Sequence, residues 1–233
     1  MSATAADLLA ELRAAGNPEQ HPQKHYHGGA AVLGVRMGDL FDITKRYSAM
    51  PVDELDRLLD EPEYEPRLAG FCVMDFAVRG AREDALRRDR YDLYLRRHDA
   101  IDTWDMVDRA APRVIGEYLL ARPRDPLFEL AASPDPLRRR TAMTAPLGFL
   151  RHGDAAARDD LLRLAALLMD DPDPVVAKPV GIALRHLGGV DPERLVAFLD
   201  FHAERMPRPT LRAAVDKLPP GSRHARPPAG RAG

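Results

Sequence analysis

The chain has 233 residues, of which 45% are hydrophobic and 6% aromatic, and its 34 basic and 36 acidic residues give a formal net charge of −2. This length fits one large or two small domains with a substantial core, and the net charge argues weakly against a nucleic-acid partner. The single cysteine, Cys72, excludes an intrachain disulfide, and neither a signal peptide nor an apolar run of roughly 18 residues is present, so we expect a cytoplasmic protein without membrane contact.

Apolar residues recur with a helical period along nearly the whole chain, and no segment alternates convincingly with period two. We therefore predict an all-α fold. The expected helices, in chain order, cover residues 5–15, 37–47, 52–59, 67–78, 87–97, 103–121, 127–132, 136–150, 156–169, 174–187, 192–202 and 210–217. The segment Asn17–His27 separates the first two with two prolines and a histidine cluster.

A repeat is present in the second half of the chain. Pro134-Asp135-Pro136 recurs 38 residues later as Pro172-Asp173-Pro174, and in each copy the Asp can cap a helix whose first residue is the following Pro. A period near 40 with two helices per unit indicates a HEAT-like solenoid, in which stacked antiparallel helix pairs form a concave groove. The alternative is a coincidental Asp-Pro helix start in an irregular bundle. We predict one HEAT-like domain over residues 1–217 and a disordered tail rich in Pro, Gly and Arg at 218–233.

Basic residues recur together with this repeat. Arg140 and Lys178 occupy matching positions, and Arg151-His152 is answered by Arg185-His186. A row of cations along successive inner helices would suit a polyanion. Its candidate members are Arg138, Arg139, Arg140, Lys178 and Arg185. For Arg138 and Arg139, an ordinary solvated helix face is an equally simple interpretation.

The stretch Thr103–Asp108 has the most distinctive chemistry. Trp104, the only tryptophan, and Asp108 would lie one turn apart on one helix face. An aromatic plate beside an acid fits a cationic, sugar-like transition state. The alternatives are a surface acid paired with Arg109 or Arg113, and a tryptophan that belongs to the core. Asp105 falls in the first turn, where an acid favours the helix dipole, so we leave it out of the site.

Several motifs, in order and at matching spacing, carry a family resemblance. They are Gly34-Val35-Arg36, Thr103–Asp108, Gly116–Leu120, Arg139–Ala142, Lys178–Gly181 with Leu184-Arg185, and Met206–Arg212. On these residues the chain resembles the AlkD-like DNA alkylation repair family, which are HEAT-repeat DNA glycosylases, from roughly Gly34 to Lys217.

The resemblance implies removal of positively charged N3- or N7-alkylated purines from double-stranded DNA, without a cofactor. It implies that Asp108 is the catalytic aspartate, that Trp104 lies against the sugar of the lesion and that Arg140 binds the DNA backbone. Tyr26 lies near the position of a DNA-facing tyrosine in the family. With Arg139, Lys178 and Arg185 from the basic row, these residues are the predicted DNA contacts. No lysine lies beside the Trp104 motif to form a Schiff base, so we predict a monofunctional enzyme that acts as a monomer.

Two departures from the family pattern leave other functions open. Ile182 stands where many members place a second tryptophan, and the distance from Tyr26 to Gly34 is one residue short. The loss of an aromatic wall is compatible with bulkier adducts, or with a homologue that binds DNA but has weak activity. A HEAT-type scaffold for a peptide partner is a third possibility, although it predicts an apolar groove and no basic row.

The histidine cluster His21, His25 and His27 is a weak candidate for zinc. Neither paired cysteines nor a second cluster completes a tetrahedral ligand set, so we predict no metal site and expect an exposed or phosphate-contacting role. The glycine pairs Gly28-Gly29 and Gly188-Gly189 lack the residues of a phosphate-binding loop.

Overall fold

The structure of the protein is a computed structural model that describes residues 3–225. It divides into two compact units, an N-terminal unit (Met1–Tyr118) and a C-terminal unit (Leu119–Gly233). The prediction of one domain over residues 1–217 concerns how these units behave in solution and stays a prediction. Residues 226–233 of the predicted tail lie outside the described residues.

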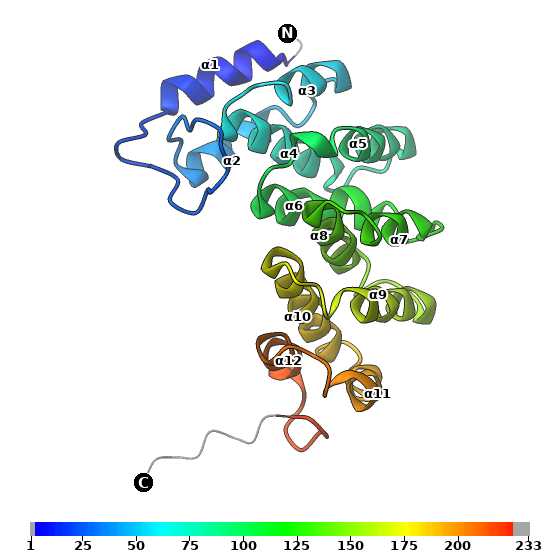
Figure 1. The fold of residues 1–233 in the computed structure, drawn as a ribbon. Helices are drawn as coiled ribbons and strands as arrows, with labels where there is room; N and C mark the ends of the chain where they lie inside the picture. Colours follow the sequence, from blue (N-terminus) through cyan, green and yellow to red (C-terminus); the bar gives the residue numbers. More distant parts are fainter. Residues whose placement is uncertain (1–2, 226–233) are drawn as a thin grey trace. The chain divides into compact units, whose positions relative to one another are not determined.

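The described residues form helices and no β-strand, which confirms the predicted all-α class (Figure 1). The N-terminal unit contains α1 (Ala5–Ala15), α2 (Met37–Arg46), α3 (Val52–Leu58), α4 (Tyr64–Val78), α5 (Asp84–Arg96), η1 (His98–Ala100), α6 (Trp104–Ala110) and η2 (Ala111–Glu117). The C-terminal unit contains α7 (Asp125–Ala131), α8 (Pro136–Thr144), η3 (Ala145–Gly148), α9 (Ala155–Leu168), α10 (Pro174–Gly188), α11 (Pro192–His202), α12 (Arg208–Ala214) and η4 (Val215–Lys217). None of the described helices is long and apolar enough to span a bilayer.

Helix α4 forms the centre of the N-terminal unit. It is buried on most of its circumference, and it packs against α1, α2, α3, α5, α6 and η2. A helix that is apolar nearly all round has to be covered by neighbours. Two of its buried residues, Glu65 and Asp75, are nevertheless acidic, and each is fully shielded from solvent. These two carboxylates organise the loop and the helix that position the candidate site.

Glu65 holds the segment that leads into α2. One carboxylate oxygen accepts hydrogen bonds from the backbone N–H groups of Gly34 at 2.8 Å and Val35 at 3.2 Å, and the other accepts from Leu33 at 2.8 Å. Gly34 has φ +75°, and a Cβ there would come within 2.4 Å of the backbone of Asn17 and Pro18. The conformation and the close approach both require glycine, which explains the first residue of the Gly34-Val35-Arg36 motif.

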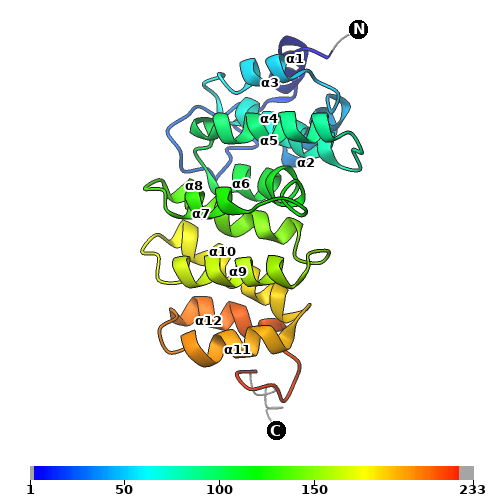
Figure 2. The ribbon, with the colours of Figure 1, turned by 90° about the vertical axis from the view of Figure 1, so that its right-hand side faces the viewer.

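The C-terminal unit is built from successive helix pairs. Helices α7, α9 and α11 form one layer and α8, α10 and α12 the other, as Figures 1 and 2 show. In the second layer α10 packs against both α8 and α12. The predicted caps are confirmed, because Asp135 accepts from the Leu137 N–H and Asp173 from the Val175 N–H, each at 2.9 Å, and Pro136 and Pro174 begin their helices.

The first residues of the predicted tail contact α11. Leu218 is buried, and Arg223 and His224 lie 3.0 and 2.8 Å from the carboxylate of Asp200. These contacts belong to residues 218–225 only, and the predicted disorder of the tail stays a prediction.

Candidate functional site

Helix α6 presents Trp104 and Asp108 away from the core. Met106, Val107 and Ala110 on the same helix are fully buried. Trp104 is 39% exposed and Asp108 is partly exposed. Because residues four apart share a helix face, the indole and the carboxylate lie on one side of α6, and this side is not the one that faces the hydrophobic core.

The helix geometry changes three residues after Asp108, where α6 ends and η2 begins. Pro112 has no N–H, so the carbonyl of residue 108 loses the donor that an α-helix would give it, and the proline ring would collide with that carbonyl. The segment that contains Pro112, Ala111–Glu117, forms a π-helix, η2. Such π segments are frequent at functional sites. The change in helix geometry therefore begins within one turn of the candidate catalytic residue.

The neighbour of Asp108 anchors α6 to the core of the N-terminal unit. Arg109 lies 3.0 Å from the buried Asp75 carboxylate, and its guanidinium stacks over the rings of Phe41 and Phe76 at 4.4 and 4.6 Å from their centroids. Arg113 also contacts Asp75, at 2.9 Å. Adjacent helical residues do not face each other, so the inward position of Arg109 fixes the rotation of α6 and the direction of Asp108.

The start of α6 is tied to the loop between α1 and α2. The carboxylate of Asp105 accepts a hydrogen bond from the Tyr64 hydroxyl, and His25 Nε2 lies 3.3 Å from the same carboxylate oxygen. Burial, and then the nearby Asp105, raises the pKa of Tyr64, so its hydroxyl stays protonated as a donor. The His25 ring meets the Trp104 indole edge to face, with centroids 6.4 Å apart. Asp105 thus holds the His25 ring that packs against the indole of Trp104.

Tyr26 lies beside this cluster. Its ring stacks on Tyr64 with centroids 4.3 Å apart, and its hydroxyl donates to Asp102 at 2.5 Å. Arg67 contacts the same Asp102 oxygen at 2.6 Å. Burial and the hydrogen bond to Asp102 raise the pKa of Tyr26. The predicted DNA-facing tyrosine therefore stacks on Tyr64, whose hydroxyl contacts Asp105 beside Trp104. The hydroxyl of Tyr26 itself is held by Asp102.

In the C-terminal unit, Arg140 has a structural contact that its sequence does not reveal. Pro179 lies inside α10 and cannot donate to the carbonyl of Val175, four residues earlier. The Arg140 guanidinium donates to this carbonyl at 2.5 Å, and Arg140 is only 2% exposed. The side chain thus satisfies a carbonyl that a helix proline leaves without its usual partner.

The other predicted DNA contacts of the C-terminal unit differ in their surroundings. Arg139 forms a two-pronged ion pair with Asp171, at 2.6 and 3.2 Å. Arg185 lies 2.8 Å from Asp216. Lys178 is exposed on α10. Of the basic row, Lys178 is therefore the member whose side chain is most open to solvent.

Sequence reasoning missed Glu65, Asp75, Tyr64 and Asp102, which hold the site without belonging to a motif. The partners through which they hold the site lie 30 or more residues away along the chain, so no local spacing could have found these contacts. Within residues 3–225, no three His, Cys, Asp or Glu side chains form a group that could hold a metal ion.

Comparisons with known proteins agree with this architecture. Over 84% of its length the chain matches 82% of a solved structure with a TM-score of 0.60 and 15% identity, and that structure is described as a new family of proteins related to the HEAT-like repeat DNA glycosylases, with affinity for branched DNA structures. This likeness confirms the predicted HEAT-like fold. No curated protein matches the sequence. A model of the DNA alkylation repair enzyme family matches residues 8–218, and the chain therefore belongs to the DNA alkylation repair enzyme family.

Proposed function

We propose that the protein is a DNA glycosylase that removes purines carrying a positive charge from N3- or N7-alkylation, and that it leaves the DNA strand uncut. The observation that carries the proposal is the pair on α6, where a 39% exposed indole and a partly exposed carboxylate share one helix face. Membership of the family over residues 8–218 supports it.

The proposed base removal requires few protein groups besides Trp104 and Asp108. The C1′–N bond breaks with both electrons moving to the purine, which loses its positive charge and leaves as a neutral base without a general acid. The sugar becomes an oxocarbenium-like cation, and a carboxylate about 4 Å away would stabilise it by roughly 4 kcal/mol at an effective dielectric constant near 20. At about 1.4 kcal/mol per decade this is a rate factor of about a thousand.

Water completes the reaction at C1′. Asp108 orients the water molecule and takes its proton as the new C1′–O bond forms. Trp104 offers its π face to the developing cation, a contribution on the order of 1 kcal/mol. The chain has four lysines, Lys24, Lys45, Lys178 and Lys217, and none lies in or beside α6 in the sequence. We therefore propose a monofunctional reaction without Schiff-base chemistry.

The proposed DNA contacts are Tyr26 and four basic residues of the C-terminal unit, namely Arg139, Arg140, Lys178 and Arg185. Lys178, exposed on α10, is the strongest candidate for a phosphate contact. Arg185, Arg139 and Arg140 are proposed to add further positive charge, and their side chains also have the contacts within the protein described above.

A second candidate is recognition of branched DNA without base removal. Ile182 stands in place of an aromatic side chain that many family members have. The related solved structure is described as having affinity for branched DNA. This candidate shares the DNA contacts and differs in the role of Asp108.

The test measures release of methylated bases from duplex DNA treated with a methylating agent. Asp108→Asn should lower excision by about a thousandfold while the affinity for DNA, measured by fluorescence anisotropy, is kept. Asp92→Asn, the same change at an exposed position of α5, should leave both unchanged. Retained excision in Asp108→Asn would refute its role. An inactive wild type that prefers a four-way junction over a linear duplex would favour the second candidate.

A further inference from the structure

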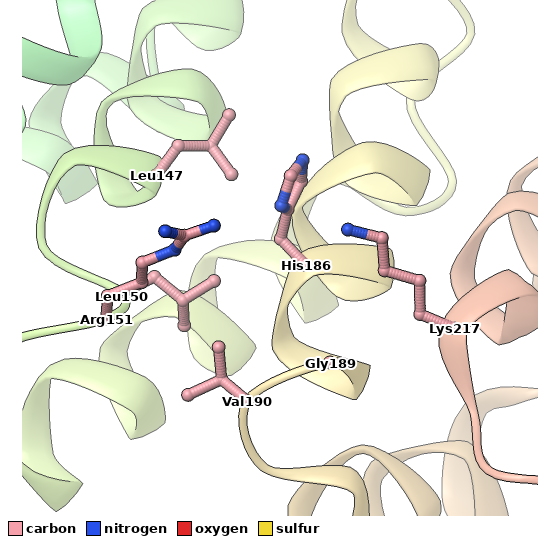
Figure 3. Close-up of a pocket in the computed structure, with 7 residues that line it drawn as sticks. All are labelled: Leu147, Leu150, Arg151, His186, Gly189, Val190 and Lys217. Carbon is pink, nitrogen blue, oxygen red and sulfur yellow. The ribbon is translucent and has the colours of Figure 1, made fainter.

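A basic pocket lies in the C-terminal unit between the end of η3, the end of α10 and η4. Its volume is about 530 Å³, within the range of small-molecule sites. Figure 3 shows that the side chains of Arg151, His186 and Lys217 approach one another across it. The lining residues are Leu147, Leu150, Arg151, His186, Gly189, Val190 and Lys217.

The charge of this lining is of one sign. Its three ionisable residues are all basic, and no carboxylate is among the lining residues. Elsewhere in the unit, arginines are typically paired with acids, as Arg124 is with Asp160 at 2.7 Å. Among residues 3–225, the side chains of Arg151, His186 and Lys217 form no such ion pair or hydrogen bond.

Stabilisation of helix ends does not explain the arrangement. A cation near the last turn of a helix interacts favourably with its dipole, and α10 already has Arg185 beside His186 in that turn. Arg151 and Lys217 come from other elements and add charges of the same sign. Burial, and then the proximity of Lys217, Arg185 and Arg151, lowers the pKa of His186. These cations are therefore close enough to His186 to disfavour its protonated form.

We propose that this pocket binds a phosphomonoester carried on an organic group. A phosphomonoester has a charge between about −1.5 and −2 near neutral pH and three acceptor oxygens, which match three convergent basic side chains. The apolar side chains of Leu147, Leu150 and Val190 provide a wall for the organic group. Two sources share this chemistry, namely a free nucleoside monophosphate and the phosphorylated end of a DNA strand.

This site is independent of the Asp108 chemistry. It uses Arg151 and His186, one residue from each of the two Arg-His pairs that recur in the sequence. Lys217 adds a third basic side chain from η4. All three side chains belong to the same unit, so the pocket is complete within it.

The experiment is isothermal titration of the full chain with deoxyadenosine monophosphate, and with deoxyadenosine as the ligand that lacks phosphate. We expect binding of the nucleotide only, and a loss of about tenfold or more in affinity in Arg151→Gln and in Lys217→Gln. Arg163→Gln changes an arginine of α9 whose side chain is 68% exposed, and this variant should bind the nucleotide as the wild type does. Equal binding of deoxyadenosine, or nucleotide binding unchanged in both pocket variants, would overturn the proposal.

A second arm separates the two sources. Short duplexes with and without a 5′-phosphate are compared for affinity in the wild type and in Lys217→Gln. A gain from the phosphate that disappears in the variant identifies the DNA end, whereas nucleotide binding without such a gain identifies the free nucleotide. If neither the nucleotide nor the phosphorylated duplex binds through Arg151 and Lys217, the pocket is not a phosphomonoester site.

Discussion

The two units of the chain are stabilised in different ways. In the C-terminal unit the helices begin at repeated local signals, with Asp135 and Asp173 capping two helices in the same geometry. In the N-terminal unit the elements are irregular, and the fully buried acids Glu65 and Asp75 connect segments that are distant in sequence. One unit thus depends on short-range hydrogen bonds that repeat, and the other on a few long-range polar contacts.

This difference decides where a substitution is costly. A surface cap can be replaced partly by water, because the freed N–H stays accessible. A buried carboxylate that satisfies backbone N–H groups has no such substitute, so its removal leaves donors without partners in the protein interior. The N-terminal unit, which holds Trp104 and Asp108, should therefore be the more sensitive of the two to single polar substitutions.

The largest effect is expected for Glu65→Ala. The change removes the acceptor of three backbone N–H groups, from Leu33, Gly34 and Val35. At about 1–3 kcal/mol for each of these three unsatisfied buried groups, we expect the free energy of unfolding to fall by at least about 3 kcal/mol. Urea unfolding followed by Trp104 fluorescence measures the loss. Glu19→Ala, at an exposed position of the loop between α1 and α2, should change the free energy of unfolding by less than about 0.5 kcal/mol.

The same titration tests the coupling of the two units. Trp104 and Cys72 both belong to the N-terminal unit, whereas circular dichroism follows helices of both units. Burial raises the pKa of the Cys72 thiol to about 12, so labelling of Cys72 reports the opening of that unit. Coincident transitions would support one domain over residues 1–217. If Glu65→Ala separates the fluorescence transition from the dichroism transition, the units unfold independently.

A smaller effect is expected for the caps of the C-terminal unit. Asp135→Ala and Asp173→Ala each remove one side-chain acceptor at 2.9 Å from a backbone N–H. The free energy of unfolding should fall by about 1 kcal/mol in each case. Because the geometry is repeated, the two losses should agree within about 0.5 kcal/mol, and Glu204→Ala at an exposed site should cost less than either. Unequal losses, measured by urea titration, would contradict equivalence of the two repeats.

The parts of the fold that could be predicted from sequence are those with local causes. Helical periodicity predicts the helices, and the Asp-Pro pairs predict two helix starts to the residue. The spacing of Trp104 and Asp108 predicts that they share a face of α6. Each of these signals is contained within a few residues of chain.

Other features of the site depend on partners that only the folded chain brings together. Arg140 matches Lys178 in the repeat, yet Arg140 is buried against the Val175 carbonyl that Pro179 leaves without its usual donor, while Lys178 is exposed. Asp105 lies in the first turn of its helix, as predicted, but its contacts are Tyr64 and His25. Position in a repeat predicts where a residue lies in its helix, and the neighbours decide what the side chain contacts.

The smallest expected effect is the contribution of His186 to stability at low pH. Its pKa is lowered in the folded protein by burial and by Lys217, Arg185 and Arg151, whereas an unfolded histidine has a pKa of about 6.5. The unfolded chain therefore binds the proton more readily. The contribution of neutral His186 to the free energy of unfolding is therefore fully present above about pH 6.5. It is lost as the pH falls through about 6.5 towards the lower pKa of the folded state.

His186→Gln removes this proton-linked loss without adding a charge. Between pH 7.5 and pH 5, the free energy of unfolding should therefore fall less in the variant than in the wild type, whereas His152→Gln, at an exposed position, should behave as the wild type does. Arg151, Arg185 and Lys217 keep their charge over this range, so the difference isolates the imidazole. Deoxyadenosine monophosphate in the pocket would supply negative charge, raise the pKa of His186 and reduce the wild-type loss. An identical pH dependence in wild type and His186→Gln would mean that the cations of the C-terminal unit do not converge on this side chain.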